Sequence, residues 1–368
     1  VAQQSMVLIK NKAELLPLKP EHLRIALIGP LADNQVDLLG CWASAGRPED
    51  VETIYDGLRK YLPAEKILFH QGCSLTGDDA PDFAGALEAA RQADVILLAV
   101  GESRAMSGEA KSRAHLGLPG RQQELANALA ELGKPLVAVV LSGRPLVIPK
   151  LASQTDALLI AWHGGIRAGQ AIADILFGAA NPSGKLTVSW PRAEGQIPVY
   201  YAHKATGRPP EGKGTTQFTE PYRSTYLDEP NEPLFAFGQG LSYSSFEYSQ
   251  LEVLTPQVRM DESLKVCARI KNTSTRAGTE VAQLYVRDLT ASVTRPVREL
   301  KGFKRLDLKA SEEREIIFEI PAHELGFIGL ENRFVVEPGR FKLWIGTDST
   351  SGLEGEFELI PTKQEEMR

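Results

Sequence analysis

The sequence predicts an α/β domain followed by an all-β domain, and three observations lead to this fold class. From about residue 23, short β-branched runs alternate with stretches of helical periodicity. From about residue 245, apolar and polar residues alternate with period two. Between these regions, residues 195–240 are rich in Pro, Gly, Tyr and charge, as in a long functional loop or a linker.

The first region is expected to form an α/β sandwich, a mostly parallel sheet with helices on both faces, because strands alternate with helices. The run at 95–100 is apolar throughout, which is typical of a strand buried on both faces. Gly133 is expected to end the second helix. The opening 1–11 has amphipathic helical spacing. Strands are predicted at 24–30, 66–70, 95–100, 136–141, 157–162 and 186–190, and helices at 84–93, 122–132 and 169–177.

The second region is predicted to be a β-sandwich of immunoglobulin or fibronectin type III kind. Its alternating runs lie at 264–270, 281–286, 314–320, 340–345 and 356–360, with turn signals between them. We expect the domain boundary at 236/237, where Phe237-Gly-Gln-Gly-Leu-Ser-Tyr begins. The first domain is then 1–236, with 1–22 as a linker from a preceding domain and 195–236 as its long loop. The second domain is 237–368.

Composition excludes some partners. The net charge is −6 and no Lys/Arg run appears, which argues against nucleic acid as a partner. The longest apolar runs are far too short to span a membrane.

The three cysteines at 41, 73 and 267 are an odd number at irregular spacing, so we expect free thiols. A Cys41–Cys73 bond stays open if the protein is exported, and the compartment itself is left open.

The loop after the predicted strand 95–100 is the candidate site. Ligands of open α/β sheets bind beyond the carboxyl ends of the strands, and Glu102, Ser103 and Glu109 all follow this strand. The small, polar and flexible stretch 101–108 can carry a carboxylate out of the domain to meet a partner surface. From the residues alone, the favoured interpretation of Glu109 is a solvated side chain paired with Lys111 or Arg113.

Cofactor motifs fail on inspection. No Gly-x-Gly-x-x-Gly follows a strand, so dinucleotide binding is disfavoured. The stretch 178–186 resembles a P-loop but has five residues between its glycines and Leu where Mg²⁺ needs Ser or Thr. The histidines make no metal-ligand spacing with Cys or acid, and His163 is expected to be packed or exposed rather than catalytic. We expect neither a metal nor an organic cofactor.

Many short segments, in one order along essentially the whole chain, resemble the β-glucosidases of glycoside hydrolase family 3. Ser107-Gly-Glu-Ala-Lys-Ser-Arg resembles the acid/base loop of that family, and Phe237-Gly-Gln-Gly-Leu-Ser-Tyr the entry to its fibronectin type III-like domain. The other matching segments are 5–11, 15–18, 24–33, 40–42, 71–73, 100–103, 118–122, 142–146, 162–165, 181–186, 197–201, 272–274, 278–286, 298–303 and 337–339.

The resemblance implies a role for each residue of the loop. Glu109, not Glu102, is expected to be the general acid/base, and Glu102 a structural residue near the strand end. Arg113 is expected to brace the loop. Arg104 and Met106 are expected either to touch the aglycone side of the substrate or to face solvent. In the family the nucleophile is an Asp on an N-terminal (β/α)₈ barrel, which this chain lacks.

The function expected from the resemblance is part of a retaining exo-acting β-glucosidase. The substrate would be a β-glucoside or cello-oligosaccharide with a terminal non-reducing β-D-glucose, and the partner a barrel domain that carries the Asp. Two alternatives stay open: a β-xylosidase of the same family, or a non-catalytic sugar-binding or assembly module. The aromatic-rich stretch 200–236 is compatible with a homodimer contact or a cover over the site, and equally with a loop held on its own domain.

Overall fold

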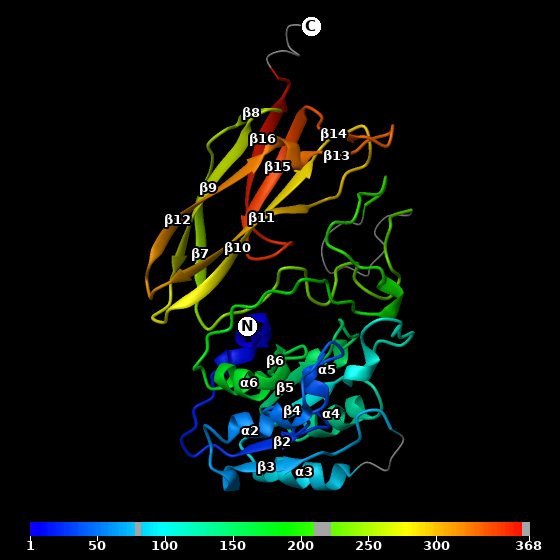
Figure 1. Cartoon of the computed structure of the whole chain (residues 1–368), viewed down its shortest axis with the longest axis vertical. Helices are drawn as coiled ribbons and strands as arrows, with labels where there is room; N and C mark the ends of the chain where they lie inside the picture. The colour runs from blue at the N-terminus through cyan, green and yellow to red at the C-terminus, as the bar shows by residue number, and fades with distance from the viewer. Residues whose placement is uncertain (78–81, 210–221, 363–368) are drawn as a thin grey trace. The chain divides into compact units, whose positions relative to one another are not determined.

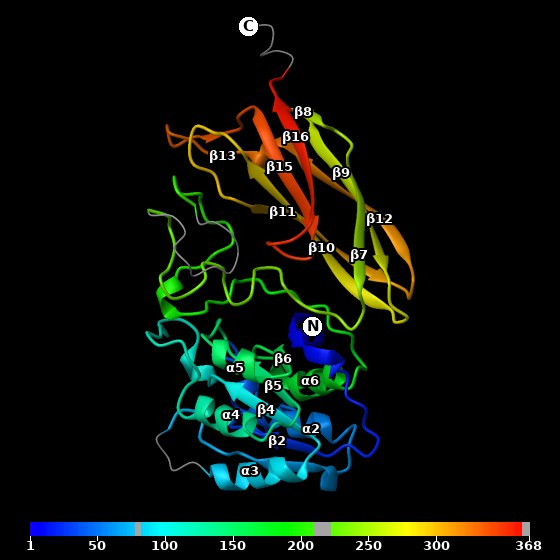
Figure 2. The ribbon, with the colours of Figure 1, turned by 180° about the vertical axis from the view of Figure 1, so that it is seen from behind.

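The computed structural model describes residues 1–77, 82–209 and 222–362, and these fall into two compact units (Figures 1 and 2). The first unit comprises Val1–Lys185, Trp190–Ile197 and Gly240–Tyr243. The second comprises Leu186–Ser189, Pro198–Gln239 and Ser244–Arg368. From residue 198 on, the described part of the long loop is therefore grouped with the second unit, whereas the predicted boundary at 236/237 assigns it to the first.

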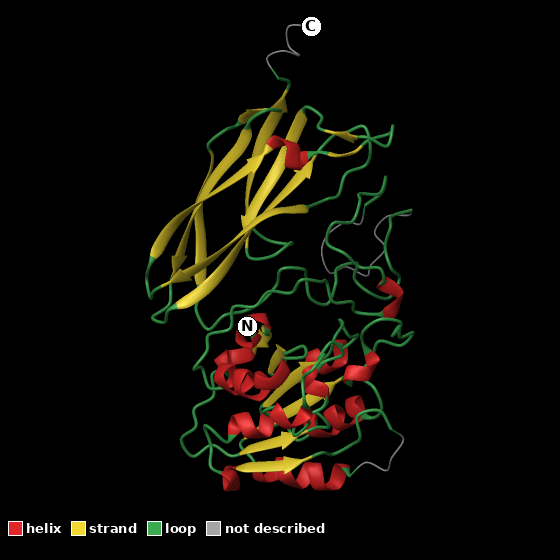
Figure 3. Ribbon diagram, in the orientation of Figure 1, coloured by secondary structure: helices red, strands yellow, loops and turns green. Residues whose placement is uncertain are grey.

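The first unit is an α/β sandwich around a six-stranded sheet of order β1-β6-β5-β4-β2-β3 (Figure 3). The strands are parallel except β1, which pairs antiparallel with β6 at one edge. All seven residues of β4 are buried, as expected of a strand covered on both faces. The strands are β1 (Val7–Asn11), β2 (Ile25–Ile28), β3 (Ile67–His70), β4 (Val95–Gly101), β5 (Leu136–Leu141) and β6 (Ala157–Ile160).

Helices cover both faces of this sheet. Helices α2 and α6 pack together over one face, in a core that includes Leu27, Leu97 and Val139 of the central strands. Helices α3, α4 and α5 pack in series over the other face. The helices are α1 (Ala2–Ser5), α2 (Ile54–Leu58), α3 (Phe83–Gln92), α4 (Gln122–Ala130), α5 (Pro149–Gln154) and α6 (Ala168–Leu176).

Two predicted elements of the first unit are wrong. Residues 1–11 form only a four-residue helix, α1, and the rest is the edge strand β1. Residues 186–190 form no strand: the Leu186 backbone bonds instead to Gln239 and Gly238, and Leu186–Ser189 belong to the second unit. In both places a partner distant in sequence decides the conformation, and local periodicity does not reveal it.

The strand order creates a topological switch between β2 and β4. From β2 the chain goes to β3 on one side and then to β4 on the other side. The loops that leave the carboxyl ends of β2 and β4 therefore part in opposite directions and leave a crevice between them, where ligands of open α/β sheets bind. This feature places the candidate site.

The second unit is a β-sandwich, which agrees with the predicted class. One sheet has the order β11-β10-β15-β16-β8 and the other β12-β9-β7, with a separate hairpin of β13 and β14. Alternate residues of both sheets form its core, among them Leu264, Leu284 and Phe357. The strands are β7 (Phe246–Val253), β8 (Gln257–Arg259), β9 (Ser263–Asn272), β10 (Gly278–Asp288), β11 (Glu299–Leu308), β12 (Glu313–Pro321), β13 (Phe327–Ile328), β14 (Phe334–Val335), β15 (Gly339–Gly346) and β16 (Leu353–Ile360).

Across the described ranges, no helix has both the length and the apolar character needed to cross a bilayer.

Candidate active site

The end of β4 is fixed by close backbone packing. Gly101 has φ +145°, and a Cβ there would lie 1.8 Å from the carbonyl oxygen of Leu141 on β5, so only glycine fits. Its N–H donates to Gln122 Oε1 at 2.8 Å, and Gln122 Nε2 donates back to its carbonyl at 2.9 Å. Gln122 is fully buried at the start of α4. The loop that follows β4 therefore begins from a rigid point.

Glu102 is the next residue, and its carboxylate has no exposed surface. It accepts hydrogen bonds from Arg113 Nη1 at 2.7 Å, Arg144 Nε at 3.2 Å and Ser142 Oγ at 2.9 Å. A buried carboxylate is tolerated only when charge and hydrogen bonds compensate it. These three donors provide that compensation, so Glu102 has the contacts of a structural residue.

The two arginines on Glu102 also hold the loop that carries Glu109. Arg113 Nη2 donates to the carbonyl of Gly117 at 3.1 Å. Arg144 Nη2 donates to the carbonyl of Met106 and, at 2.7 Å, to that of Lys111. Carbonyls on both sides of Glu109 are thus bound by arginine. Arg144 is not among the residues predicted for the site, although its position just after strand β5 is a usable signal.

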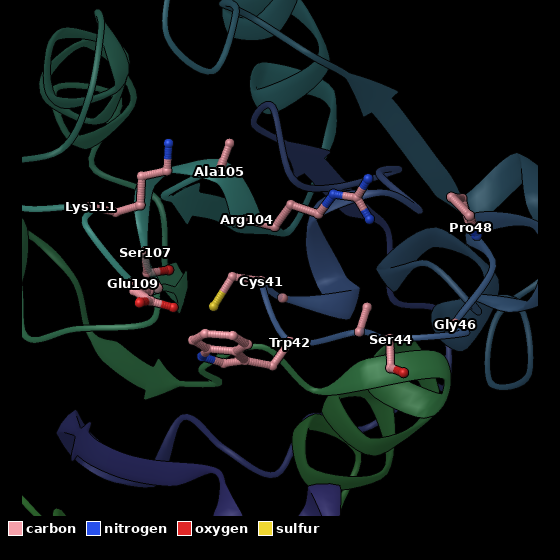
Figure 4. Close-up of a pocket in the computed structure, with 13 residues that line it drawn as sticks. Cys41, Trp42, Ser44, Gly46, Pro48, Arg104, Ala105, Ser107, Glu109 and Lys111 are labelled. Atoms are coloured by element: carbon pink, nitrogen blue, oxygen red, sulfur yellow. The ribbon is translucent and has the colours of Figure 1, made fainter.

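Glu109 itself is exposed and lines a pocket of about 640 Å³ at the switch between β2 and β4 (Figure 4). Figure 4 shows Glu109, Cys41 and Trp42 together at one end of this pocket. The Trp42 side chain is 75% exposed. The lining residues come from the loops after the two strands: Gly40, Cys41, Trp42, Ala43, Ser44, Gly46, Pro48, Arg104, Ala105, Ser107, Gly108, Glu109 and Lys111.

Of the two residues predicted to touch the aglycone side, only Arg104 lines the pocket. Arg104 lines the pocket, and its backbone N–H donates to Asp37 Oδ1 at 2.8 Å. Met106 is half-buried and is not one of the lining residues. The segment 40–48 was not expected in the site. It could have been found only from the strand order, which makes the loop after β2 a neighbour of the loop after β4.

A polar pair without partners lies beneath the loop. His163 Nδ1 is 3.0 Å from the carbonyl oxygen of Asp37, so Nδ1 must carry the proton and Nε2 is a lone-pair acceptor. Within the described part of the chain, neither His163 Nε2 nor the buried Ser107 Oγ has a hydrogen-bond partner. Both atoms lie within 3.4 Å of the position that a Cβ on Gly143 would occupy. The pKa of His163 is lowered, chiefly because burial disfavours the charged imidazolium. The hydrogen bond to the Asp37 carbonyl and the negative charges of Glu102 and Asp37 raise this pKa, but by less.

The site offers no metal-binding set and no disulfide. No group of three or more His, Cys, Asp or Glu side chains within residues 1–77, 82–209 and 222–362 could hold a metal ion. All three cysteines are free thiols, which confirms that expectation, and the Cys41–Cys73 bond left open above does not form. Cys41 is exposed, and its Sγ lies 3.2 Å from where a Cβ on Gly108 would be.

The arrangement can supply one carboxyl group to chemistry. Among the thirteen lining residues, all in the described part of the chain, Glu109 has the only carboxylate. A retaining glycosidase needs two carboxyl groups about 5–5.5 Å apart. The pocket therefore offers one carboxyl group, where such an enzyme needs two.

Comparison with known proteins matches both units. A family model described as the glycosyl hydrolase family 3 C-terminal domain matches residues 6–243, and one described as a fibronectin type III-like domain matches residues 280–349. A periplasmic β-glucosidase of Salmonella typhimurium is 41% identical over 98% of this chain and 49% of its own length. A β-xylosidase of Formosa agariphila is 37% identical over 95% of this chain and 48% of its own length.

Solved structures of β-glucosidases also resemble this chain. The crystal structure of a β-glucosidase from Listeria innocua in complex with isofagomine superposes with a TM-score of 0.91 at 42% identity. It covers 98% of this chain, while this chain covers 49% of it. The chain thus spans about half the length of the relatives that it matches.

Proposed function

Because the chain belongs to glycosyl hydrolase family 3, we propose that it supplies the general acid/base, Glu109, of a retaining exo-acting β-glucosidase. The observation that carries this proposal is that Glu109 is the one carboxylate lining the pocket at the β2/β4 switch. The nucleophile, an Asp, comes from a barrel domain outside these residues. Relatives about twice as long support this division.

In the first step the barrel Asp attacks the anomeric carbon of a terminal non-reducing β-D-glucose, and Glu109 protonates the leaving oxygen. In the second step Glu109 takes a proton from a water molecule that attacks the anomeric carbon, which breaks the bond between glucose and the Asp and releases glucose with retained configuration. The arginine contacts of Met106, Lys111 and Gly117 hold the loop so that Glu109 can be presented to a group on another domain. The substrate class is β-glucosides or cello-oligosaccharides.

The test is Glu109→Ala in the protein together with its barrel domain. General acid/base catalysis contributes about 10²–10⁴-fold, so turnover of glucosides with poor leaving groups should fall by that order. A 2,4-dinitrophenyl glucoside should lose less in its first step, and added azide should restore rate and give β-glucosyl azide. Glu65→Ala, an exposed glutamate outside the pocket, is the matched control. Unchanged kinetics for Glu109→Ala would remove the assignment.

The alternative is a non-catalytic sugar-binding or assembly module, and the single carboxylate in the pocket favours considering it. Residues 1–368 alone should not hydrolyse an aryl β-glucoside, and turnover by this chain alone would refute the two-part site. The β-xylosidase alternative is less favoured, since the β-glucosidase of Salmonella typhimurium is the more similar relative. The ratio of aryl β-glucoside to aryl β-xyloside hydrolysis decides between them.

A homodimer contact through the long loop is a further part of the proposal. Tyr201 stacks on Phe237 with ring centroids 4.2 Å apart, so the start of the loop is held on the second unit. Tyr200 and Tyr222 remain 57% and 80% exposed and are available to a second copy. Much of 206–218 lies outside the described residues. Deleting 206–218 should change the sedimentation coefficient, and an unchanged oligomer would end the idea.

A further inference from the structure

The pocket beside Glu109 has more positive than negative charge. Its thirteen lining residues include two cations, Arg104 and Lys111, against the one carboxylate of Glu109. The chain as a whole has net charge −6, so the positive excess in the pocket is local and does not reflect a generally basic surface. The two cations lie on the loop after β4, on either side of Glu109.

Within the residues that the structure describes, these two cations have no neutralising partner. The other two arginines that contact the loop, Arg113 and Arg144, both pair with the buried Glu102. By contrast, neither the Arg104 guanidinium nor the Lys111 ammonium has an ion-pair or hydrogen-bond partner anywhere in the described residues. An unpaired cation in a concave site attracts negatively charged ligands.

The backbone at both cations is held in place. The N–H of Arg104 bonds to Asp37 at the start of the 3₁₀ turn Arg104–Met106, and the Lys111 carbonyl accepts from Arg144. The exposed indole of Trp42 adds a flat apolar surface to the same pocket. Because Glu109 protonates the leaving oxygen in the proposed function, the leaving group would lie next to the pocket that Glu109 shares with Arg104 and Lys111. Figure 4 shows the charged ends of Arg104 and Lys111 directed away from the Glu109 carboxylate, so these exposed side chains would turn to meet a charged leaving group.

We propose that Arg104 and Lys111 make the enzyme selective for β-glucosides whose leaving group carries a carboxylate. This inference rests on the proposed function and specifies its substrate class. A guanidinium binds a carboxylate with directed, charge-assisted hydrogen bonds, and an ammonium adds a point charge. Both side chains are at least partly exposed, so solvent screens their attraction for a carboxylate. We therefore expect a modest preference of about three- to tenfold.

The experiment compares two substrates that differ only in charge. These are 4-(carboxymethyl)phenyl β-D-glucoside and its neutral amide, whose phenols are equally good leaving groups because the methylene insulates the ring. Glucose release by the protein with its barrel domain gives kcat/KM for each. The wild-type ratio of acid to amide should be about three to ten. The ratio should fall as salt rises, because screening weakens the attraction.

Variants test whether Arg104 and Lys111 cause the preference. Arg104→Gln/Lys111→Gln should bring the ratio to about one, and Arg104→Lys should retain part of it. Lys19→Gln, an exposed lysine outside the pocket, should leave the ratio at its wild-type value. The ratio itself is the readout, so effects on overall activity cancel.

Two outcomes overturn the inference: a wild-type ratio of one or less, and a ratio that the double variant retains. In each of these cases the amide is still hydrolysed and the proposed function stands. If neither glucoside is hydrolysed and Glu109→Ala behaves like wild type, the proposed function itself has failed.

Discussion

Arg113 donates a hydrogen bond of 2.7 Å to Glu102, a carboxylate with no exposed surface. Glu102 is also bound by Arg144, and the two arginines in turn bind carbonyls along the loop that presents Glu109. Glu102, at the end of β4, has no role in the proposed chemistry. Through its two arginines it holds the loop that carries Glu109, the proposed acid/base.

Glu102→Gln should destabilise the first unit strongly, because it leaves two arginines, each with only 20% of its side chain exposed, beside a neutral group. Breaking a buried pair in this way costs about 3–5 kcal/mol. Urea unfolding should show an earlier transition for the α/β unit, while the β-sandwich transition serves as an internal control. A loss below about 1 kcal/mol would mean that water reaches Glu102.

Gly101→Ala should be as damaging, for a steric reason. The new Cβ would lie 1.8 Å from the Leu141 carbonyl oxygen, at a φ of +145° that L residues rarely adopt. Strain and clash together should cost more than about 3 kcal/mol. Gly195→Ala is the matched control, because a Cβ there meets nothing within 4 Å. Similar midpoints for the two variants in thermal unfolding would contradict this account of the strand end.

Much of the fold follows from the sequence because the strands in the centre of the sheet are buried on both faces. β4 and β5 are continuous apolar runs, and such runs can be recognised as buried strands from the sequence. The edge strand β1 cannot be recognised in this way. The apolar run 6–9 suits a helix equally well until β6 is known to be the partner of β1. Residues 186–190 are similar: their β-branched pattern is real, but their backbone partners lie at 238 and 239.

The candidate site was less accessible to sequence reasoning. The position after a buried strand makes Glu109 a candidate, but only the resemblance distinguishes it from other exposed acids, since it has no hydrogen-bond or ion-pair partner among the described residues. The loop at 40–48 becomes part of the site only through the order β4-β2-β3, a tertiary property. Arg144 is paired with Glu102 across 42 residues, and only the adjacency of β4 and β5 brings them together.

The cysteines should differ sharply in reactivity. Cys41 is exposed, while Cys73 and Cys267 are buried, and burial raises the pKa of Cys73 to about 11. Since the thiolate is the nucleophile, 5,5′-dithiobis(2-nitrobenzoate) at pH 8 should release one equivalent quickly from the native chain and three after denaturation. Cys41→Ser should abolish the fast phase. A fast phase that survives this change would show that a buried cysteine becomes exposed readily.

Stability should fall at mildly acidic pH because of His163. Its pKa in the folded chain lies below the ordinary value of 6.5, chiefly through burial. Near pH 6.5 the unfolded chain therefore takes up a proton that the folded chain does not. The contribution of His163 to stability is complete above that pH, and it declines as the pH falls toward the lower, folded pKa. The slope is at most about 1.4 kcal/mol per pH unit.

His163→Asn tests this, because an amide can still donate to the Asp37 carbonyl but does not titrate. The difference in unfolding free energy between wild type and variant should shrink as the pH is lowered from 7.5 to 5, while contributions from other groups cancel. His22→Asn is the matched control, since His22 is exposed and its φ of +61° suits asparagine. A difference that grows on acidification would show that Glu102 and Asp37, the acids whose charges act on His163, stabilise its imidazolium form.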